Sequence, residues 1–564
     1  MLCVHERGDW IAIRYYGCRW FSFSHVCQTW RAIALGCASL WTKPDFSFPY
    51  LAEQMIERSK SALLDIELKH ELPDSKKAWL IKEGVLLRAL CQLDRIQSLR
   101  LRLQRTDKDQ AEKLISALTK ISAANLRYLE VHVGMFCVGG LTLPQGVFEG
   151  NTRCLSHLRL HGCIIPSTSL LLSNLTHLRL PCTPQYPSIL NVLQKTSLLV
   201  SLEIILSCPE LDSVVGQVVL PYLQRLHLTL SVRGTPDILF YLSFPRTTQL
   251  FIECQYLSPS QPWVVHSQIM MNAITSLMGM STYREIKTLA LRTTEPKGVS
   301  LHAKSGAVIL EAWNTSDVST NAGGLNPPSS PHLQVRLNWE AYHPKQKDPL
   351  IPYAAGVKAA IDGLSLPSLE SFYLNISLTL DMSRYDIIKE CLKSLQTSSS
   401  LRKLHVLGDL SDQLYPIYGM VGVATTTKVA TAKQGPSRFL ALETLSISHL
   451  DFRYAECAMI KVLSMCGRQR KLVISHCRNV TRADIAFLER YIEEVEWDDS
   501  QAMPRCWDLF LTKAIGTQKV GGSWVLAFAW KVWGSHINVN LELRCVILGY
   551  AFLLIYTFKF GVSC

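Results

Sequence analysis

The sequence predicts an α/β solenoid, an arc or horseshoe of stacked strand–helix units, preceded by a short α-helical segment. Three observations predict this fold class. A leucine-containing template recurs over about 400 residues. Inside each copy, apolar and polar residues alternate as they do in a strand with one buried face. Between copies, apolar residues return at helical spacing.

The overall composition indicates a folded chain. Of the 564 residues, 48% are hydrophobic and only 18% are charged. Such a chain has enough apolar surface to offset the entropy lost on ordering, so a largely disordered protein is excluded. The net charge of +12 is spread along the sequence without a basic segment. Nucleic acid is therefore not expected as a partner, because its binders concentrate positive charge.

The template is L-x-x-L-x-L, and it predicts the strands. Its fourteen exact or looser copies begin at Ile96, Leu126, Leu155, Leu175, Leu199, Leu223, Thr247, Ile286, His332, Leu369, Leu401, Leu442, Gln469 and Ile492. The intervals bracket the ~20–29 residues of leucine-rich repeats, with longer units in the middle. The sequence thus predicts a leucine-rich-repeat solenoid over residues 61–500.

Helices and loops are expected between the copies. Apolar residues have helical spacing in 108–124, 186–197 and 385–399. Two stretches rich in Gly, Pro, Ser and Thr, 320–331 and 423–437, are expected to be a loop and a disordered loop. The first would divide the array into lobes at 61–319 and 332–500.

The polar residue inside each copy identifies a candidate substrate face. In a solenoid these positions point away from the core and meet partners across several strands. They include Arg100, Glu130, Arg159, Arg179, Glu203, His227 and His405. For each one, a merely solvated side chain is the alternative interpretation. The arginines, with Arg292, predict a mildly basic stripe and hence an acidic protein surface as partner.

A helical segment precedes the repeats. Val26, Trp30, Ile33 and Ala34 fall on one helical stripe, with Ser24 as N-cap and Gly36 closing the helix. A second short turn carries Leu40 and Trp41. So short a helix cannot bury its own tryptophan, so it must pack on neighbours or on a partner. If both tryptophans are internal, truncating Trp30 should destabilise the segment.

Residues 20–68 resemble a known family. The pattern V-C-x-x-W-R-x-[IL]-A, followed by LW, resembles the second half of the F-box, and the continuation resembles basidiomycete F-box families. The matching residues are Val26, Cys27, Trp30, Arg31, Ile33, Ala34, Leu40 and Trp41. The resemblance implies an F-box-like segment at about 17–60, after an atypical amino terminus at 1–16. It also implies a non-enzymatic substrate receptor that binds the Skp adaptor of an SCF-type cullin-RING ubiquitin ligase, with the repeats choosing an unknown protein substrate.

One part of the F-box pattern is missing. The family's first helix begins with L-P-x-E-[IL], and residues 1–19 contain no such segment. Either the true start lies upstream of Met1, or the adaptor interaction is weak or lost. The rival hypothesis is a leucine-rich-repeat scaffold without a ubiquitin-ligase role, whose terminal helix caps the solenoid.

Catalytic and metal-binding motifs are not found. The sequence holds no G-x-S-x-G, H-E-x-x-H, P-loop or G-x-G-x-x-G pattern. The nearest constellations are His161 with Cys163 and His476 with Cys477, which are best interpreted as satisfied histidines beside core cysteines. We therefore expect no enzyme, no cofactor and no metal.

The remaining features concern the tail and the compartment. Residues 501–564 contain the apolar runs 523–533 and 545–558, and the second is shorter than the ~20 residues of a membrane span. A capping element, a marginal tail anchor and a mispredicted exon are the three alternatives, and a membrane partner is not expected. The first residues lack the layout of a secretory signal and the 18 cysteines form no Cys-x-x-Cys pair, so an intracellular location, cytoplasmic or nuclear, is expected.

Overall fold

The fold was analysed in a computed structural model. It describes residues 27–69, 76–103, 108–120, 122–134, 141–180, 189–205, 216–230, 234–254, 263–277, 285–294, 304–316, 331–341, 351–364, 366–376, 395, 398–407, 441–449, 470–477, 480–490 and 492–498. The predicted disordered loop 423–437 and the tail 501–564 lie outside the described residues.

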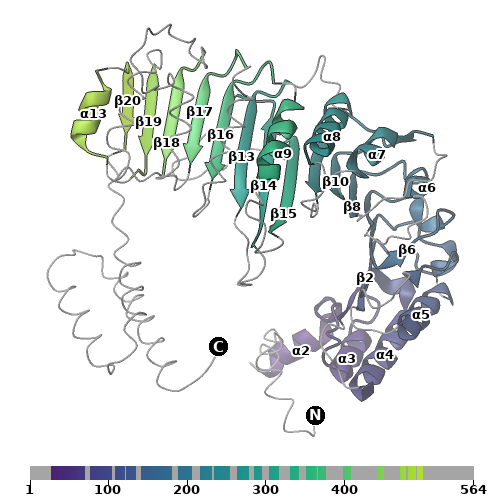
Figure 1. Cartoon of the computed structure of the whole chain (residues 1–564). Coiled ribbons are helices and arrows are strands. Elements are labelled where there is room, and N and C mark those ends of the chain that lie inside the picture. Colours follow the sequence, from purple (N-terminus) through teal and green to yellow (C-terminus); the bar gives the residue numbers. More distant parts are fainter. Residues whose placement is uncertain are drawn as a thin grey trace, which may run out of the picture. The chain divides into compact units, whose positions relative to one another are not determined.

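Sixteen strands of the described residues form one sheet (Figure 1). In spatial order they are β1 Leu64–Lys69, β2 Ile96–Leu103, β3 Tyr128–Val133, β5 His157–His161, β7 His177–Leu180, β8 Ser201–Ile205, β10 Arg225–Leu230, β12 Gln249–Cys254, β15 Leu333–Ala341, β14 Lys304–Trp313, β13 Thr288–Thr294, β16 Ser371–Ile376, β17 Lys403–Leu407, β18 Thr444–Ser448, β19 Lys471–Ser475 and β20 Glu494–Trp497. Each of the fourteen template copies contains one of these strands, so the predicted α/β leucine-rich-repeat solenoid is confirmed.

Helices connect the strands. Among the described residues, the α-helices are α2 Gln28–Gly36, α3 Pro49–Arg58, α4 Lys76–Leu90, α5 Lys108–Ala117, α6 Ile189–Leu193, α7 Gly234–Tyr241, α8 Trp263–Leu277, α9 Ile351–Asp362 and α13 Arg482–Leu488. Short 3₁₀ turns occur at η2 Ala38–Trp41, η3 Leu93–Arg95, η4 Leu118–Lys120, η5 Val147–Gly150 and η6 Leu170–Leu172. Two small parallel pairs join β4 Leu141–Thr142 to β6 Cys163–Ile164 and β9 Val218–Val219 to β11 Leu242–Ser243. The predicted helices at 108–124 and 186–197 correspond to α5 and α6, whereas 385–399 is mostly outside the described residues.

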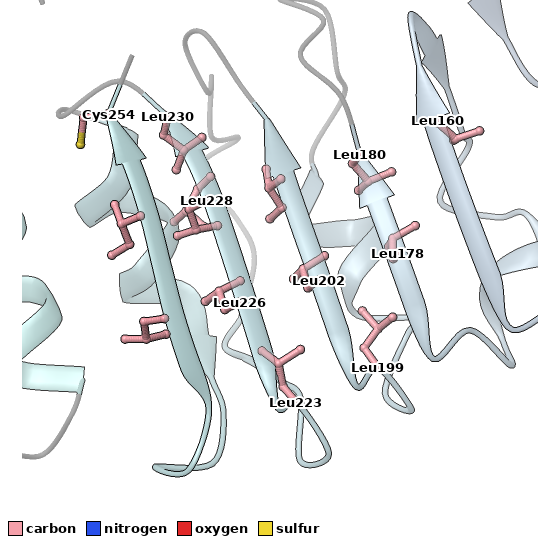
Figure 2. Packing of buried hydrophobic residues seen from close by; sticks show 14 of the residues in the cluster. Leu160, Leu178, Leu180, Leu199, Leu202, Leu223, Leu226, Leu228, Leu230 and Cys254 are labelled. Carbon is pink, nitrogen blue, oxygen red and sulfur yellow. The ribbon is translucent and has the colours of Figure 1, made fainter. Parts of the chain in front are cut away.

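The core lies between the sheet and the helices. Leucines at the same register position, such as Leu178, Leu202 and Leu226, stand side by side on neighbouring strands and are buried (Figure 2). Helix residues such as Ile115 of α5 and Met270 of α8 complete the same core cluster. Burying one such side chain contributes roughly 1.5–3 kcal/mol, which explains why the template positions are apolar.

The middle of the sheet departs from simple stacking. β12 pairs in parallel with β15, with Leu250 opposite Leu333, while β13 pairs in parallel with β16. β14 runs antiparallel between β15 and β13. The chain therefore passes over two positions in the sheet between β12 and β13, and it fills them on its return, first with β14 and then with β15. Residues 320–330, which the sequence assigns to a loop between lobes, lie outside the described residues, and the described strands before and after them belong to one sheet.

The amino-terminal helix begins later than expected. Its N-cap is Cys27, whose Sγ accepts a hydrogen bond from the backbone N–H of Trp30 at 3.5 Å, so the predicted Ser24 cap is wrong. Val26 lies outside the described residues. Trp41 of η2 is fully buried and its indole Nε1 donates to the carbonyl oxygen of Ala34 at 2.8 Å. This hydrogen bond ties α2 to η2.

We expect Gly162→Ala to destabilise the solenoid by about 2 kcal/mol or more, since a left-handed residue other than glycine costs ~1–2 kcal/mol and the new methyl group also clashes. Gly162 lies between β5 and β6 with φ +68°, and a Cβ there would lie 2.4 Å from the carbonyl oxygen of Val133. Urea denaturation followed by circular dichroism measures the loss. Gly146→Ala is the control, because its φ is −90° and a Cβ would meet nothing within 4 Å. Equal stability of the two variants would contradict this prediction.

Candidate functional site

One face of the sheet, opposite the leucine core, carries a row of polar residues. Strand register places Arg100, Glu130, Arg159, Arg179, Glu203 and His227 directly beside one another across β2, β3, β5, β7, β8 and β10. We call this row and its neighbours on the same face the polar face. All six candidate residues that the sequence analysis gives for this part of the array lie in the row. The structure thus brings them together on one face of the sheet.

Both glutamates of the row are engaged by neighbours. Tyr128 donates its O–H to Glu130 at 2.7 Å, and Nε of Arg102 donates to the same carboxylate at 3.1 Å. Burial raises the pKa of Glu130, but the hydrogen bond from Tyr128 and the charge of Arg102 outweigh it and hold that pKa below its usual value. Glu203 lies 3.4 Å from Arg179 and 3.7 Å from His227. These carboxylates are committed to pairs on the face.

Arg100 and Arg159 are different. Their guanidinium carbons lie 4.7 Å and 5.8 Å from the centre of the Tyr128 ring, which is within cation–π range. Within the described ranges, no carboxylate forms an ion pair with either side chain. They are therefore the two arginines of the row that make cation–π contacts and no ion pair among the described residues.

Histidines flank the row, and sequence reasoning did not place most of them on the face. The rings of His157 and His177 stack at 4.0 Å between centroids with 9° between their planes, and those of His132 and His161 meet at 4.0 Å edge to face. The signal was present as the residue before the second leucine in LSHLRL and LTHLRL. Burial, aided by the charge of His161, lowers the pKa of His132 to about 4, and burial also lowers the pKa of His157 and His177.

The same face is closed in the middle of the sheet. Ala290, Trp313 and Tyr373 point away from the leucine core, yet each is only 2–3% exposed. Nη2 of Arg292 lies 2.7 Å from Oε2 of Glu311, so the expectation that Arg292 contributes to an open basic stripe is wrong. His405 stacks on Tyr373 at 4.1 Å, and its buried Nε2 has no hydrogen-bond partner among the described residues. The polar face is therefore closed around Ala290, Trp313 and Tyr373, whereas the row on β2 to β10 is accessible.

The F-box-like residues separate into a buried and an exposed group. Ala34 and Trp41 are buried, whereas Trp30 is 55% and Ile33 57% exposed. Leu40 is also exposed. Arg31 makes contacts within the chain, and Cys27 caps the helix. Because Trp30 is exposed, the prediction that its truncation destabilises the segment is not supported.

The two cysteine–histidine neighbourhoods are structural. Cys163 is fully buried in β6, while the ring of His161 meets that of His132 edge to face. Sγ of Cys477 contacts the carbonyl oxygens of Ile447 and Ser475 at 3.6 Å and 3.3 Å, and His476 lies 3.5 Å from Asp498. In the part of the chain that the structure describes, no three His, Cys, Asp or Glu side chains are grouped to hold a metal ion. No helix among the described residues is long and apolar enough to cross a membrane.

Comparisons with known proteins give weak structural similarities to solved structures. The sequence matches no protein-family model and no curated protein. The leucine-rich-repeat protein LIC12759 of Leptospira interrogans is 12% identical, with 83% of this chain and 98% of that chain covered and a TM-score of 0.26. The internalin InlF of Listeria monocytogenes is 13% identical, with 69% and 94% covered and a TM-score of 0.19. Similarities of this strength support no functional argument, so function has to be argued from the residues of this chain.

Proposed function

We propose that this chain is a non-enzymatic substrate receptor that holds a protein partner on the polar face of β2 to β10 and docks through α2 onto the Skp adaptor of an SCF-type ubiquitin ligase. The observation that carries the adaptor part is the exposure of apolar side chains on α2 and η2. These residues, called here the apolar patch, are Trp30, Ile33, Leu35 and Leu40. Large apolar side chains gathered on one short segment favour a protein interface.

The division of the F-box-like residues supports the same proposal. Trp41 and Ala34 hold the segment together from inside, through the indole–carbonyl hydrogen bond. Trp30 and Ile33 lie three residues apart on the same helix, so they form neighbouring positions on its surface. A residue that only stabilised the segment would be expected inside it. An exposed tryptophan at the centre of an apolar patch is instead typical of a binding hot spot.

A second candidate function has its own observation. The segment also packs against the first strand of the array: the backbone N–H of Asp65 donates to the carbonyl oxygen of Thr42 at 2.9 Å, and Asp45 forms a β-bridge with Glu67. Such contacts are those of a solenoid cap, which repeat proteins need to cover their terminal core. In a scaffold without a ligase role, covering the end of the core in this way would be the whole function of the segment.

Binding of the purified full-length chain to a fungal Skp adaptor, measured by biolayer interferometry, separates the two. We expect the unmodified chain to bind. The affinity of the double variant Trp30→Ala/Ile33→Ser should be lower by a factor of about ten or more, as for a hot-spot pair. The control Tyr50→Ala/Leu80→Ser removes two exposed apolar side chains elsewhere, on α3 and α4, and should bind like the parent.

Two outcomes would overturn the ligase proposal. If the unmodified chain shows no binding to the adaptor, the scaffold remains as the function. If the control variant weakens binding as much as the patch variant, the interaction is a general apolar attraction and the apolar patch is not the docking site. Melting temperatures of all variants are compared first, so that unfolding is not mistaken for lost binding.

A further inference from the structure

The strongest unexplained feature of the polar face is the arrangement around Tyr128. Arg100 from β2 and Arg159 from β5 both lie over its ring, at 4.7 Å and 5.8 Å. The phenol O–H is already used by Glu130. The ring thus positions two guanidinium groups from strands on either side of β3. A guanidinium group donates two parallel N–H bonds to a carboxylate, and pre-positioning reduces the entropy lost on binding.

The neighbouring carboxylates form no ion pair with these two arginines among the described residues, although the charge of Arg159 helps to lower the pKa of Glu130. Glu130 is held by Arg102 and Tyr128, and Glu203 by Arg179 and His227. In the described part of the array, neither carboxylate forms an ion pair with Arg100 or Arg159. The two arginines therefore have donors to offer to a ligand.

A second group of donors stands beside them. His157 lies opposite Tyr128 in the strand register, and His177 lies opposite His157. The Nδ1 atoms of the two rings are each 2.9 Å from a hydroxyl oxygen, of Ser156 and Thr176 respectively. Each ring keeps Nε2 as its other nitrogen, for which no hydrogen bond occurs among the described residues.

We infer that Arg100, Arg159 and the His157–His177 stack together bind carboxylates of an acidic segment of the protein partner, and that this binding tightens as the pH falls. The inference rests on the protein-binding part of the proposed function and is independent of the adaptor part. An acidic protein is favoured over a nucleic acid because Glu130 and Glu203 lie in the same row, where they would repel a continuous phosphate backbone.

The pH dependence follows from the surroundings of the two histidines. The titratable and charged groups on the strands around them are Tyr128, Glu130, Arg159, His161, Arg179, Glu203 and Arg225. Burial, and then the neighbouring positive charges, lower the pKa of both rings, so both are neutral at pH 7. A bound carboxylate favours the protonated ring, so binding takes up protons and affinity rises on acidification. The ligand's own glutamates stay ionised down to about pH 4.3.

The test uses the full chain and a fluorescein-labelled octaglutamate peptide, with fluorescence anisotropy at low salt. We expect the dissociation constant to fall at least about threefold between pH 7.5 and pH 6.0, by proton linkage. Arg100→Gln/Arg159→Gln should weaken binding about tenfold at both pH values. His157→Asn/His177→Asn should bind like the parent at pH 7.5 and lose the gain at pH 6.0.

A matched control removes equal charge elsewhere. Arg127→Gln/Arg153→Gln changes two exposed arginines in the loops before β3 and β5 and should keep the parent affinity. The inference is wrong if this control weakens binding as much as the Arg100/Arg159 variant, or if single-stranded DNA of equal charge binds more tightly than the peptide. If the His157→Asn/His177→Asn variant still binds the peptide more tightly at pH 6.0 than at pH 7.5, the two histidines are not part of the binding site. Loss of adaptor binding alone would leave all these results unchanged.

Discussion

Replacing Trp41 by alanine is expected to lower the free energy of unfolding of the segment 27–58 by about 3–5 kcal/mol, the usual cost of truncating a buried tryptophan. The side chain is 0% exposed. Its removal also leaves the carbonyl oxygen of Ala34 without the indole donor, and takes away the ring over which the Arg58 guanidinium lies at 4.7 Å. Hydrogen exchange measured by mass spectrometry over this segment, with urea denaturation of the whole chain, gives the loss.

Trp30→Ala is the matched comparison for Trp41→Ala. It removes the same side chain from the same segment, but from a position that is 55% exposed, so we expect a change below about 1 kcal/mol. The protection of backbone amides in residues 27–58 against hydrogen exchange should then be lost in the Trp41→Ala variant and kept in the Trp30→Ala variant. If the two variants lose equal protection, Trp30 is part of the core of the segment and cannot be the centre of a docking patch.

Acidification is expected to destabilise the chain through His405. Burial, followed by the positive charge of Lys403, lowers the pKa of His405 to about 4 from an ordinary 6.5. The unfolded chain therefore binds a proton at this residue at higher pH than the folded chain does. The contribution of neutral His405 to the free energy of unfolding is complete above pH 6.5 and is lost as the pH falls towards 4. The loss is about 3 kcal/mol in total, at 1.36 kcal/mol per pKa unit.

His405→Phe tests this contribution. Phenylalanine keeps an aromatic ring against Tyr373, cannot bind a proton and has no buried Nε2 to leave without a partner. Urea denaturation gives the free energy of unfolding at pH 7.0 and at pH 4.5. Between these pH values the free energy of unfolding of the unmodified chain should fall by about 2–3 kcal/mol more than that of the variant. Lys403→Gln should reduce that difference slightly, because it removes the second cause of the lowered pKa. A variant as acid-sensitive as the parent would show that His405 is not responsible.

The strands could be predicted because one face of each is buried by the same layer of helices. The alternation in IQSLRLRL reflects Leu99, Leu101 and Leu103 facing the core while Arg100 and Arg102 face outward. β1 was not counted among the copies, although Leu63, Ile66 and Leu68 satisfy the looser template and Ile66 and Leu68 pair with Leu99 and Leu101. β14 was missed because its run Ala307 to Leu310 lacks alternation. Val308 and Leu310 are buried on the core side and Ala307 on the other.

The order of the middle strands could not be predicted from the sequence. The copies that form β13 and β15 satisfy the same template. The alternation of apolar residues along a strand specifies which face of that strand is buried, but not which other strand pairs with it in the sheet. The row of the polar face could be predicted, because it needs only the alternation and a constant register. The partnership of Arg292 with Glu311 could not, because Glu311 belongs to the strand that the template missed.

The inserted antiparallel strand also affects how the chain folds. Repeat proteins commonly fold by propagation, each unit adding to a finished neighbour. Leu226 of β10 pairs with Leu202 of β8, one short unit earlier in the chain. By contrast, Leu250 of β12 can pair with Leu333 of β15, and Thr288 of β13 with Ser371 of β16, only after the long intervening segments have been synthesised. Closing loops of that length raises the contact order at one place and slows the step there. During synthesis, β12 therefore presents an unpaired edge until β15 has left the ribosome, and an unpaired strand edge of this kind favours aggregation of the nascent chain.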